Sequence, residues 1–260
     1  MDIWQAIILG VAQGLAEFLP ISSSGHLVLL QQIFGIQESG LFFGVMLHVG
    51  TLIAVFVVFW KDIVAILKKP IQKLTGLLIV ATVPAIIVGL FFKDTVEMLF
   101  AGKFLGWGFL VTAVVLFLSD RIPEGKKNLE QMNGKNALIV GICQAIAIVP
   151  GISRSGSTIV GSLTQKLDRR SAARFSFLMS IPAILGSAVM ELKDVIVEGT
   201  GGIPLLPVLV GMAVSAVFGY IAIRAMLKII TNKKMKYFAI YVAVVGIFVL
   251  ADQFIFHWFF

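Results

Sequence analysis

Long apolar stretches occupy most of the sequence, and polar residues gather in short segments between them. A helix needs roughly 20 apolar residues to cross a bilayer. Six stretches reach or approach that length, at residues 41–60, 74–92, 104–119, 172–190, 203–223 and 237–258. This pattern predicts an all-α integral membrane protein with six transmembrane helices, in which the polar segments form the loops.

Two further apolar runs are too short to span the membrane, and each is interrupted by a Pro/Gly/Ser break. The breaks begin at Pro20 and Pro150, and a second short apolar piece follows each of them. A short helix, a break and another short helix are typical of a re-entrant hairpin, which enters the membrane and leaves on the same side. We therefore expect two re-entrant helical hairpins, at about residues 3–36 and 137–164.

The chain also repeats itself at an offset of 131 residues, and the matches include polar and glycine positions as well as apolar ones. The offset places Gly10, Gln13, Ala16, Ile21, Ser22, Ser24 and Gly25 onto Gly141, Gln144, Ala147, Ile152, Ser153, Ser155 and Gly156. Each half then contains one hairpin and three spans, and an odd number of spans inverts the second half relative to the first. We expect a single membrane domain, residues 1–260, built from inverted repeats at 1–130 and 131–260. Secondary transporters share this inverted-topology repeat, and paired broken helices mark their binding sites.

The composition agrees with a membrane protein. Of the 260 residues, 58% are hydrophobic and 13% are charged, whereas soluble domains have roughly 45–50% and about 25%. The mean hydropathy is +0.99. The single cysteine, Cys143, excludes an internal disulfide, and its apolar neighbours favour a buried packing role over a reactive thiol.

The positive charges fall mainly between alternate pairs of spans. The net charge is +7, and 17 of the 21 Lys and Arg residues lie in the segments 61–73, 120–136, 165–174 and 224–236. Three lie in the alternate segments. The positive-inside rule therefore assigns the first set to the cytoplasm and both termini to the outside, so that the first hairpin opens to the outer side. The same distribution explains the charge without a nucleic-acid partner.

The most polar run inside an apolar region is EFLPISSSGH, from Glu17 to His26. Polar groups at membrane depth are tolerated only where protein buries them or where they line a cavity, so this run is a candidate site. Gln13 lies four residues before Glu17 and shares its helix face. An acid in an apolar segment is either protonated or paired with a cation or a metal ion. The alternative is a helix-terminal Glu17 that reaches the membrane interface.

Three serines follow the break at Pro20, although capping the next helix, which begins near Gly25, needs only one. They are Ser22, Ser23 and Ser24. His26 falls in the first turn of that helix, close in sequence to these hydroxyls, and we interpret it as functional. His48, in the first span, is interpreted as a packing residue, with a contact to the site as the alternative. His257, near the C-terminus, is interpreted as an ordinary end-of-span residue.

The second break is rich in groups that donate hydrogen bonds. Residues 150–158 read PGISRSGST, which puts glycines and hydroxyl side chains beside a helix start. Backbone N–H groups, hydroxyls and the positive end of a helix dipole all bind anions, and the guanidinium of Arg154 suits phosphate in particular. A buried guanidinium needs an anionic partner. A phosphorylated ligand is the preferred partner, and a structural ion pair with Glu17 is the alternative.

Together the two breaks offer an acid, an imidazole, hydroxyls and an arginine, which are groups used in phosphoryl transfer. A site in the membrane favours an amphiphilic substrate such as a lipid phosphate or pyrophosphate. A transporter or flippase is the main alternative, because inverted repeats with broken helices are also a transporter architecture and the same residues could bind a lipid phosphate. A purely structural role leaves Arg154 and the serines unexplained.

These residues resemble the signatures of a known family, the undecaprenyl-pyrophosphate phosphatases of the bacitracin-resistance type. The run QGLAEFLPISSSGH, residues 13–26, is similar to the family's Glu/Gln-x-x-x-Glu motif with its following Ser/His segment. The run PGISRSGST, residues 150–158, is similar to the second signature, Pro-Gly-x-Ser-Arg-Ser-x-x-Thr. Chain length, span count and repeat agree with the family over essentially the whole chain. Gln13 stands where the motif also allows an acid, so a two-carboxylate metal site lacks one ligand here.

The resemblance implies hydrolysis of undecaprenyl pyrophosphate to undecaprenyl phosphate, with a divalent cation, Mg²⁺ or Ca²⁺, as cofactor and Glu17 as a candidate ligand. It implies catalytic roles for Glu17, Ser23, His26 and Arg154. His26 acting on the terminal phosphate is the preferred mechanism, while Ser23 is either the nucleophile or a phosphate ligand. Residues expected to bind the substrate are Gln13, Ser22, Ser24, Gly25, Gly151, Ser153, Ser155, Gly156 and Thr158.

The same resemblance implies a place in the bacterial cytoplasmic membrane, where the enzyme would recycle the lipid carrier of peptidoglycan synthesis and so support the cell wall and cell shape. The implied partners are the lipid bilayer and the polyprenyl pyrophosphate. Bacitracin resistance would follow indirectly, through the substrate that enzyme and antibiotic share. Gly102 and Gly106, at the start of a span, suit either a homodimer or packing within the chain.

Overall fold

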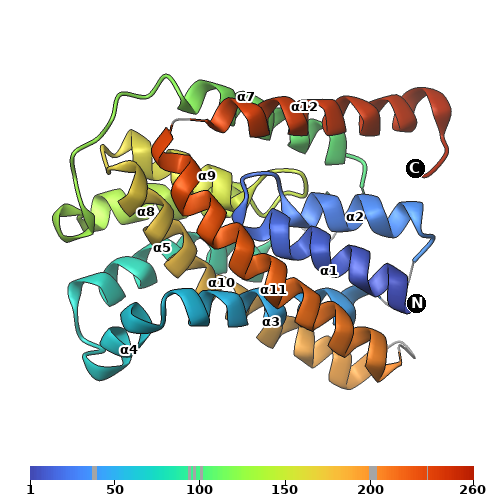
Figure 1. Cartoon of the computed structure of the whole chain (residues 1–260), viewed down its shortest axis with the longest axis horizontal. Coiled ribbons are helices and arrows are strands. Elements are labelled where there is room, and N and C mark those ends of the chain that lie inside the picture. The colour runs from blue at the N-terminus through green and yellow to red at the C-terminus, as the bar shows by residue number, and fades with distance from the viewer. Residues whose placement is uncertain (37–39, 93–94, 96–97, 100–101, 199–203, 233) are drawn as a thin grey trace.

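The computed structural model describes the chain from residue 1 to 260 except 37–39, 93–94, 96–97, 100–101, 199–203 and 233. In the described part every regular element is a helix, in agreement with the predicted all-α class. The two chain ends lie at one end of the molecule, whereas α4 (Trp60–Lys68) lies at the other, and α12 (Met235–Ala251) runs along one side toward the C-terminus (Figure 1).

Six helices coincide with the six predicted spans. They are α3 (Gly40–Val58), α5 (Lys73–Phe91), α7 (Leu105–Ser119), α10 (Arg169–Glu198), α11 (Leu205–Ile229) and α12. By length and apolar composition, three described helical segments qualify as membrane spans, namely Lys73–Phe91, Leu205–Asn232 and Met235–Phe256, and a fourth qualifies if α3 and α4 form one bent span. The protein therefore has several apolar helices that could cross a membrane, and the count of six stays a prediction.

Each predicted hairpin is a pair of short helices with a break between them. The pairs are α1 (Ile3–Phe18) with α2 (Ser23–Ile33), and α8 (Gly134–Ile146) with α9 (Arg154–Thr164). Pro20 lies in the first break, where its missing N–H does not interrupt a helix. Ser22 and Ser153 cap the helices that follow the two breaks. The helix–break–helix pattern follows the prediction, and the re-entrant course through a membrane stays a prediction.

Residues 61–73, which were predicted to be a loop, contain the helix α4. This helix turns 83° away from α3. It is amphipathic, since Ile63 packs into the core while Lys61 is exposed. Asp62 forms an ion pair with Arg174 of α10 and so ties α4 to that helix. Two of the four basic residues that indicated a loop, Lys61 and Lys68, are exposed residues of this helix.

Helices from the two halves of the chain pack against each other. α1 packs on α11, α8 packs on α5, and α7 pairs with α12 along one side of the molecule (Figure 1). The offset of 131 residues relates α1 to α8 and α5 to α11, so the first two contacts are counterparts. A Cβ at Gly10 would lie 2.6 Å from the Gly211 oxygen, and one at Gly141 would lie 2.5 Å from the Ala81 oxygen. Such small residues allow helices in membranes to approach closely.

The apolar core surrounds the two breaks. Phe18, next to Glu17, is buried and packs edge to face on Phe177 of α10, with ring centroids 5.5 Å apart. Many large apolar side chains on the outer faces of α5, α11 and α12 are exposed, which suits helices that face lipid. Gly106 packs against Leu250 within the α7–α12 pair, so this glycine serves packing inside the chain.

Candidate active site

The two breaks meet in the structure although they lie in different halves of the chain. Ser155, in the first turn of α9 after the second break, donates a hydrogen bond to the Leu19 carbonyl of the first break, at 3.0 Å. A Cβ added at Gly25 would lie 3.0 Å from Gly151. Gly151 has φ +87°, a left-handed conformation that glycine adopts at little cost. A larger residue at Gly25 would therefore push against the second break, and one at Gly151 would clash with the backbone of α7.

The helices that leave the breaks begin in the same way. The Ser22 hydroxyl accepts a hydrogen bond from the Gly25 N–H at 3.3 Å, and the Ser153 hydroxyl accepts one from the Gly156 N–H at 3.1 Å. These serines are counterparts under the repeat. Ser22 has φ 70°, which is strained for a residue with a side chain. Both hydroxyls therefore build helix starts, a role beyond the substrate binding expected of them.

The carboxylate of Glu17 lies where the breaks meet. Its side chain is 6% exposed, and its oxygens accept from three neighbouring side chains. Ser23 Oγ donates to Oε2 at 2.6 Å, and Gln13 Nε2 donates to the same oxygen at 3.0 Å. Arg154 Nη2 forms an ion pair with Oε1. The structure thus pairs the acid at the end of α1 with the arginine at the start of α9, which the sequence left open as the alternative.

Arg154 also links the Glu17–Arg154 ion pair to α10. Its Nη1 donates to the Ser176 carbonyl of α10 at 3.2 Å, and Thr158 lies 2.6 Å from the Ser176 hydroxyl. Several partners for each charge are what a buried ion pair needs to offset its desolvation. A guanidinium has five N–H donors, and the two contacts in the described structure use only part of them. Arg154 therefore keeps donors for an anionic ligand while it holds Glu17.

His26 lies between α7 and α12. Its Nδ1 is 2.8 Å from the Ser22 carbonyl oxygen, which can only accept, so the neutral ring carries its proton on Nδ1. Its Nε2 accepts from the Tyr241 hydroxyl at 2.8 Å. Phe109 packs edge to face on the imidazole. Among the described residues no direct hydrogen bond joins His26 to Glu17, so the two groups occupy separate parts of the site.

Three residues near the site were missed by the sequence analysis, namely Thr112, Ser176 and Tyr241. Thr112 Oγ1 donates to the Gly151 carbonyl at 2.8 Å and accepts from the Ser153 N–H at 2.9 Å, so α7 clamps the second break. A hydroxyl inside an apolar span is the signal that could have found Thr112 and Ser176. No comparable signal marks Tyr241, because aromatic residues are common in spans.

His48 reaches the site, which was the alternative to the packing role preferred from the sequence. Its Nδ1 donates to the Gly44 carbonyl at 2.8 Å, and its Nε2 lies 3.7 Å from Glu17 Oε2. A protonated His48 would therefore form a second ion pair with Glu17. Since α3 packs against α1, a residue in the first full span reaches the first break.

The oxygen atoms near Glu17 that could act as metal ligands suit only a weakly bound cation. No group of three or more His, Cys, Asp or Glu side chains in the described chain could hold a metal ion. Gln13 Oε1 is buried without a hydrogen-bond partner in the described structure, close to Glu17. Mg²⁺ keeps several waters and is often held by one or two carboxylates together with substrate phosphates. Glu17 and Gln13 supply oxygen atoms of the kind that such a cation binds.

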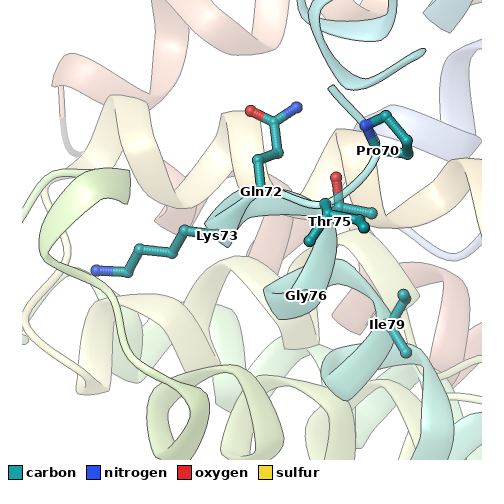
Figure 2. Close-up of a pocket in the computed structure, with 7 residues that line it drawn as sticks. Pro70, Gln72, Lys73, Thr75, Gly76 and Ile79 are labelled. Atoms are coloured by element: carbon teal, nitrogen blue, oxygen red, sulfur yellow. The ribbon is translucent and has the colours of Figure 1, made fainter. Parts of the chain in front are cut away.

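Two cavities lie apart from these residues. A surface hollow of about 450 Å³ is formed by residues 70–79 at the start of α5 (Figure 2). Figure 2 shows Lys73 extending away from Pro70 and Ile79, and its ammonium donates to the Glu130 carbonyl. A second cavity, of about 420 Å³, is lined mainly by apolar residues of α3, α4, α5 and α10. Neither cavity is lined by a predicted catalytic residue.

The apolar helices and the paired breaks define a multi-pass helical membrane protein with a buried polar cluster where two broken helices meet. The chain matches the family described as "Bacitracin resistance protein BacA" over residues 6–248, and it belongs to that family. The resemblance indicated by the two motifs is therefore confirmed.

Named relatives match nearly the whole chain. An undecaprenyl-diphosphatase of Carboxydothermus hydrogenoformans is 47% identical over 256 residues, covering 97% of this chain and 98% of the relative. Undecaprenyl-diphosphatase 3 of Bacillus cereus is 46% identical over 255 residues, covering 98% of each chain. An undecaprenyl-diphosphatase of Methanosphaera stadtmanae is 43% identical over 270 residues, covering 95% of this chain and 96% of the relative.

Proposed function

We propose that this protein is a membrane-embedded phosphatase that hydrolyses undecaprenyl pyrophosphate to undecaprenyl phosphate and inorganic phosphate. Family membership and the names of the relatives support this activity. The observation that carries the proposal is the contact of Glu17 with both Ser23 and Arg154. It joins a base, a hydroxyl nucleophile and a phosphate-binding cation in one cluster.

The geometry supports Ser23 as the attacking group. Its hydroxyl donates to Glu17 at 2.6 Å, as a nucleophile does beside its base. Attack of Ser23 Oγ on the terminal phosphorus forms a phosphoserine, breaks the bond from that phosphorus to the bridging oxygen, and passes the hydroxyl proton to Glu17. Undecaprenyl phosphate leaves. Arg154 would bind the terminal phosphoryl oxygens and stabilise the charge that develops on them.

His26 would serve the second step, hydrolysis of the phosphoserine. Its Nε2 lone pair takes a proton from water, the resulting hydroxide attacks the phosphorus, and Glu17 returns its proton to Ser23 Oγ as phosphate leaves. The imidazolium then gives its proton to solvent. The sequence favoured direct action of His26 on the terminal phosphate, and either route makes His26 essential.

The remaining polar groups of the two breaks would hold the pyrophosphate. Backbone N–H groups and hydroxyls at the starts of α2 and α9 suit anionic oxygens. We assign this role to Gln13, Ser22, Ser24, Gly25, Gly151, Ser153, Ser155, Gly156 and Thr158. A divalent cation, Mg²⁺ or Ca²⁺, held by Glu17 and Gln13 with the pyrophosphate, would neutralise part of the substrate's charge.

The proposal includes six spans, two re-entrant hairpins and an inverted repeat in the bacterial cytoplasmic membrane. The counterpart contacts of α1 with α11 and of α8 with α5 support the repeat. The basic helix α4 lies at the end of the molecule remote from both termini (Figure 1), in keeping with cytoplasmic basic segments and external termini. The first hairpin would then receive its substrate from the outer leaflet.

Phosphate release by the purified protein in detergent, with Mg²⁺ or Ca²⁺, tests the proposal. His26→Ala and Arg154→Ala should lower the rate of release from undecaprenyl pyrophosphate by about 10²-fold or more. The matched controls are His257→Ala and Arg174→Ala, whose wild-type side chains are exposed and should not affect the rate. If a variant and its control release phosphate at the same rate, the substituted residue is not part of the site.

A transporter or flippase of a lipid phosphate is the alternative with the same site. Broken helices from two halves of the chain would suit it, whereas the names of the relatives favour hydrolysis. Wild-type protein that releases no phosphate but moves undecaprenyl phosphate across proteoliposomes would favour the transporter.

A further inference from the structure

Tyr241 of α12 contacts His26 from the opposite half of the chain. Its hydroxyl lies 2.8 Å from His26 Nε2, and its ring is within 8° of parallel to the imidazole, with centroids 5.6 Å apart. The Ser22 carbonyl binds the other ring nitrogen at 2.8 Å. Phe109 of α7 packs edge to face on the same imidazole, with centroids 5.2 Å apart. Both ring nitrogens of His26 therefore have hydrogen-bond partners, and two aromatic rings pack against the imidazole.

The direction of these hydrogen bonds determines what the imidazole can do. Because the proton lies on Nδ1, the phenol of Tyr241 donates to the lone pair on Nε2. A general base or a nucleophile reacts through this lone pair. The Ser22 carbonyl sets the tautomer, and the hydroxyl bound at Nε2 orients the ring before the reacting group arrives. That group then replaces the hydroxyl.

The surroundings of Tyr241 permit that replacement. Tyr241 is 46% exposed, whereas His26 is 9% exposed, so the phenol can turn away from Nε2 without opening the core. The other two tyrosines of the chain make different contacts. The Arg224 guanidinium lies over the ring of Tyr220, and the Lys236 ammonium lies over the ring of Tyr237. Tyr237 belongs to the same helix as Tyr241 and is a matched control.

We propose that Tyr241 is a positioning residue for His26. Its hydroxyl reinforces the Nδ1–H tautomer that the Ser22 carbonyl sets, orients the imidazole through Nε2, and yields Nε2 to the reacting group. This inference rests on the proposed phosphatase function. Tyr241→Phe keeps the stacked ring and removes the hydroxyl, so it should lower kcat about ten-fold while KM changes less than about three-fold. Tyr237→Phe should leave both constants unchanged.

The experiment combines these kinetics with direct observation of the imidazole. In protein labelled with ¹⁵N in the histidine rings, the Nδ1 and Nε2 resonances report protonation and hydrogen bonding, and a His26→Gln sample assigns those of His26. The His26 Nε2 resonance should move in Tyr241→Phe and stay in place in Tyr237→Phe. Neither result depends on the enzyme being active.

Three outcomes would overturn the inference in distinguishable ways. An unmoved Nε2 resonance in Tyr241→Phe contradicts the hydrogen bond itself. A moved resonance with unchanged kcat contradicts the positioning role. Wild-type protein that releases no phosphate contradicts the proposed function and the catalytic part of the inference together, while the resonance still reports the contact on its own.

Discussion

Removal of the Arg154 guanidinium perturbs the contact between the two breaks most directly. Arg154→Met keeps a long side chain but leaves the Glu17 carboxylate, which is 6% exposed, without its cation. Breaking a buried ion pair by removing one partner costs about 3–5 kcal/mol. Glu17 keeps hydrogen bonds from Gln13 and Ser23, and Arg154 is itself 17% exposed. We therefore expect the lower end of that range, about 3 kcal/mol.

The matched control is Arg174→Met. Arg174 pairs with Asp62 but is 45% exposed, and exposed pairs contribute only about 0–1 kcal/mol. In a protein of this size each kcal/mol shifts Tm by roughly 2–4 °C, so Arg154→Met should lower Tm by roughly 6–12 °C and Arg174→Met by less than about 4 °C. Thermal unfolding in one detergent, followed by tryptophan fluorescence, measures both shifts.

A double-mutant cycle separates the ion pair from other effects of the substitutions. Glu17→Gln combined with Arg154→Met removes both charges, so the double variant should be more stable than the sum of the single losses predicts, by about 2 kcal/mol. Additive losses would refute the reasoning that these two charges stabilise each other. Equal Tm shifts for the two Arg→Met variants would refute it as well.

The remaining predictions concern packing and topology. Thr112→Val leaves the two backbone partners of this hydroxyl on the second break unsatisfied, so it should cost about 2–3 kcal/mol of unfolding free energy, whereas Thr112→Ser should stay near wild type. Gly10→Ala should destabilise by about 1–3 kcal/mol, because its Cβ would lie 2.6 Å from the backbone of α11, while Gly44→Ala, with no atom within 4 Å of its Cβ, should not destabilise. Chemical denaturation compares each pair, and equal losses within a pair would contradict these contacts. In a variant without the native cysteine, a thiol label should reach Glu130→Cys only from the cytoplasm and His257→Cys only from outside, and the reverse labelling would overturn the proposed orientation.

Much of the fold follows from the sequence because hydrophobic length and helix breakers act locally. The six apolar stretches correspond to helices, and Pro20 and Pro150 lie in the two breaks. α4 was missed because a short amphipathic helix between charged residues has the same composition as a loop. Its packing on Arg174, which is distant in sequence, distinguishes it from a loop.

The candidate site was only partly predictable for a related reason. The repeat and the polar runs predict that the two breaks belong together, and Glu17, Ser23 and Arg154 do meet. Helices that are apolar on every side carry little information about their rotation, so the sequence does not tell which residues of α3 and α12 face the breaks. The contacts of His48 and Tyr241 with the site depend on that rotation.

The central claim is that the Ser23 hydroxyl, held by Glu17, attacks the terminal phosphate. Release of inorganic phosphate from undecaprenyl pyrophosphate by Ser23→Ala, with Ser119→Ala as a buried serine outside the site, tests it most directly. We predict that Ser23→Ala loses about 10³-fold or more of the wild-type rate while Ser119→Ala stays within about two-fold. Equal phosphate release by the two variants would contradict the claim.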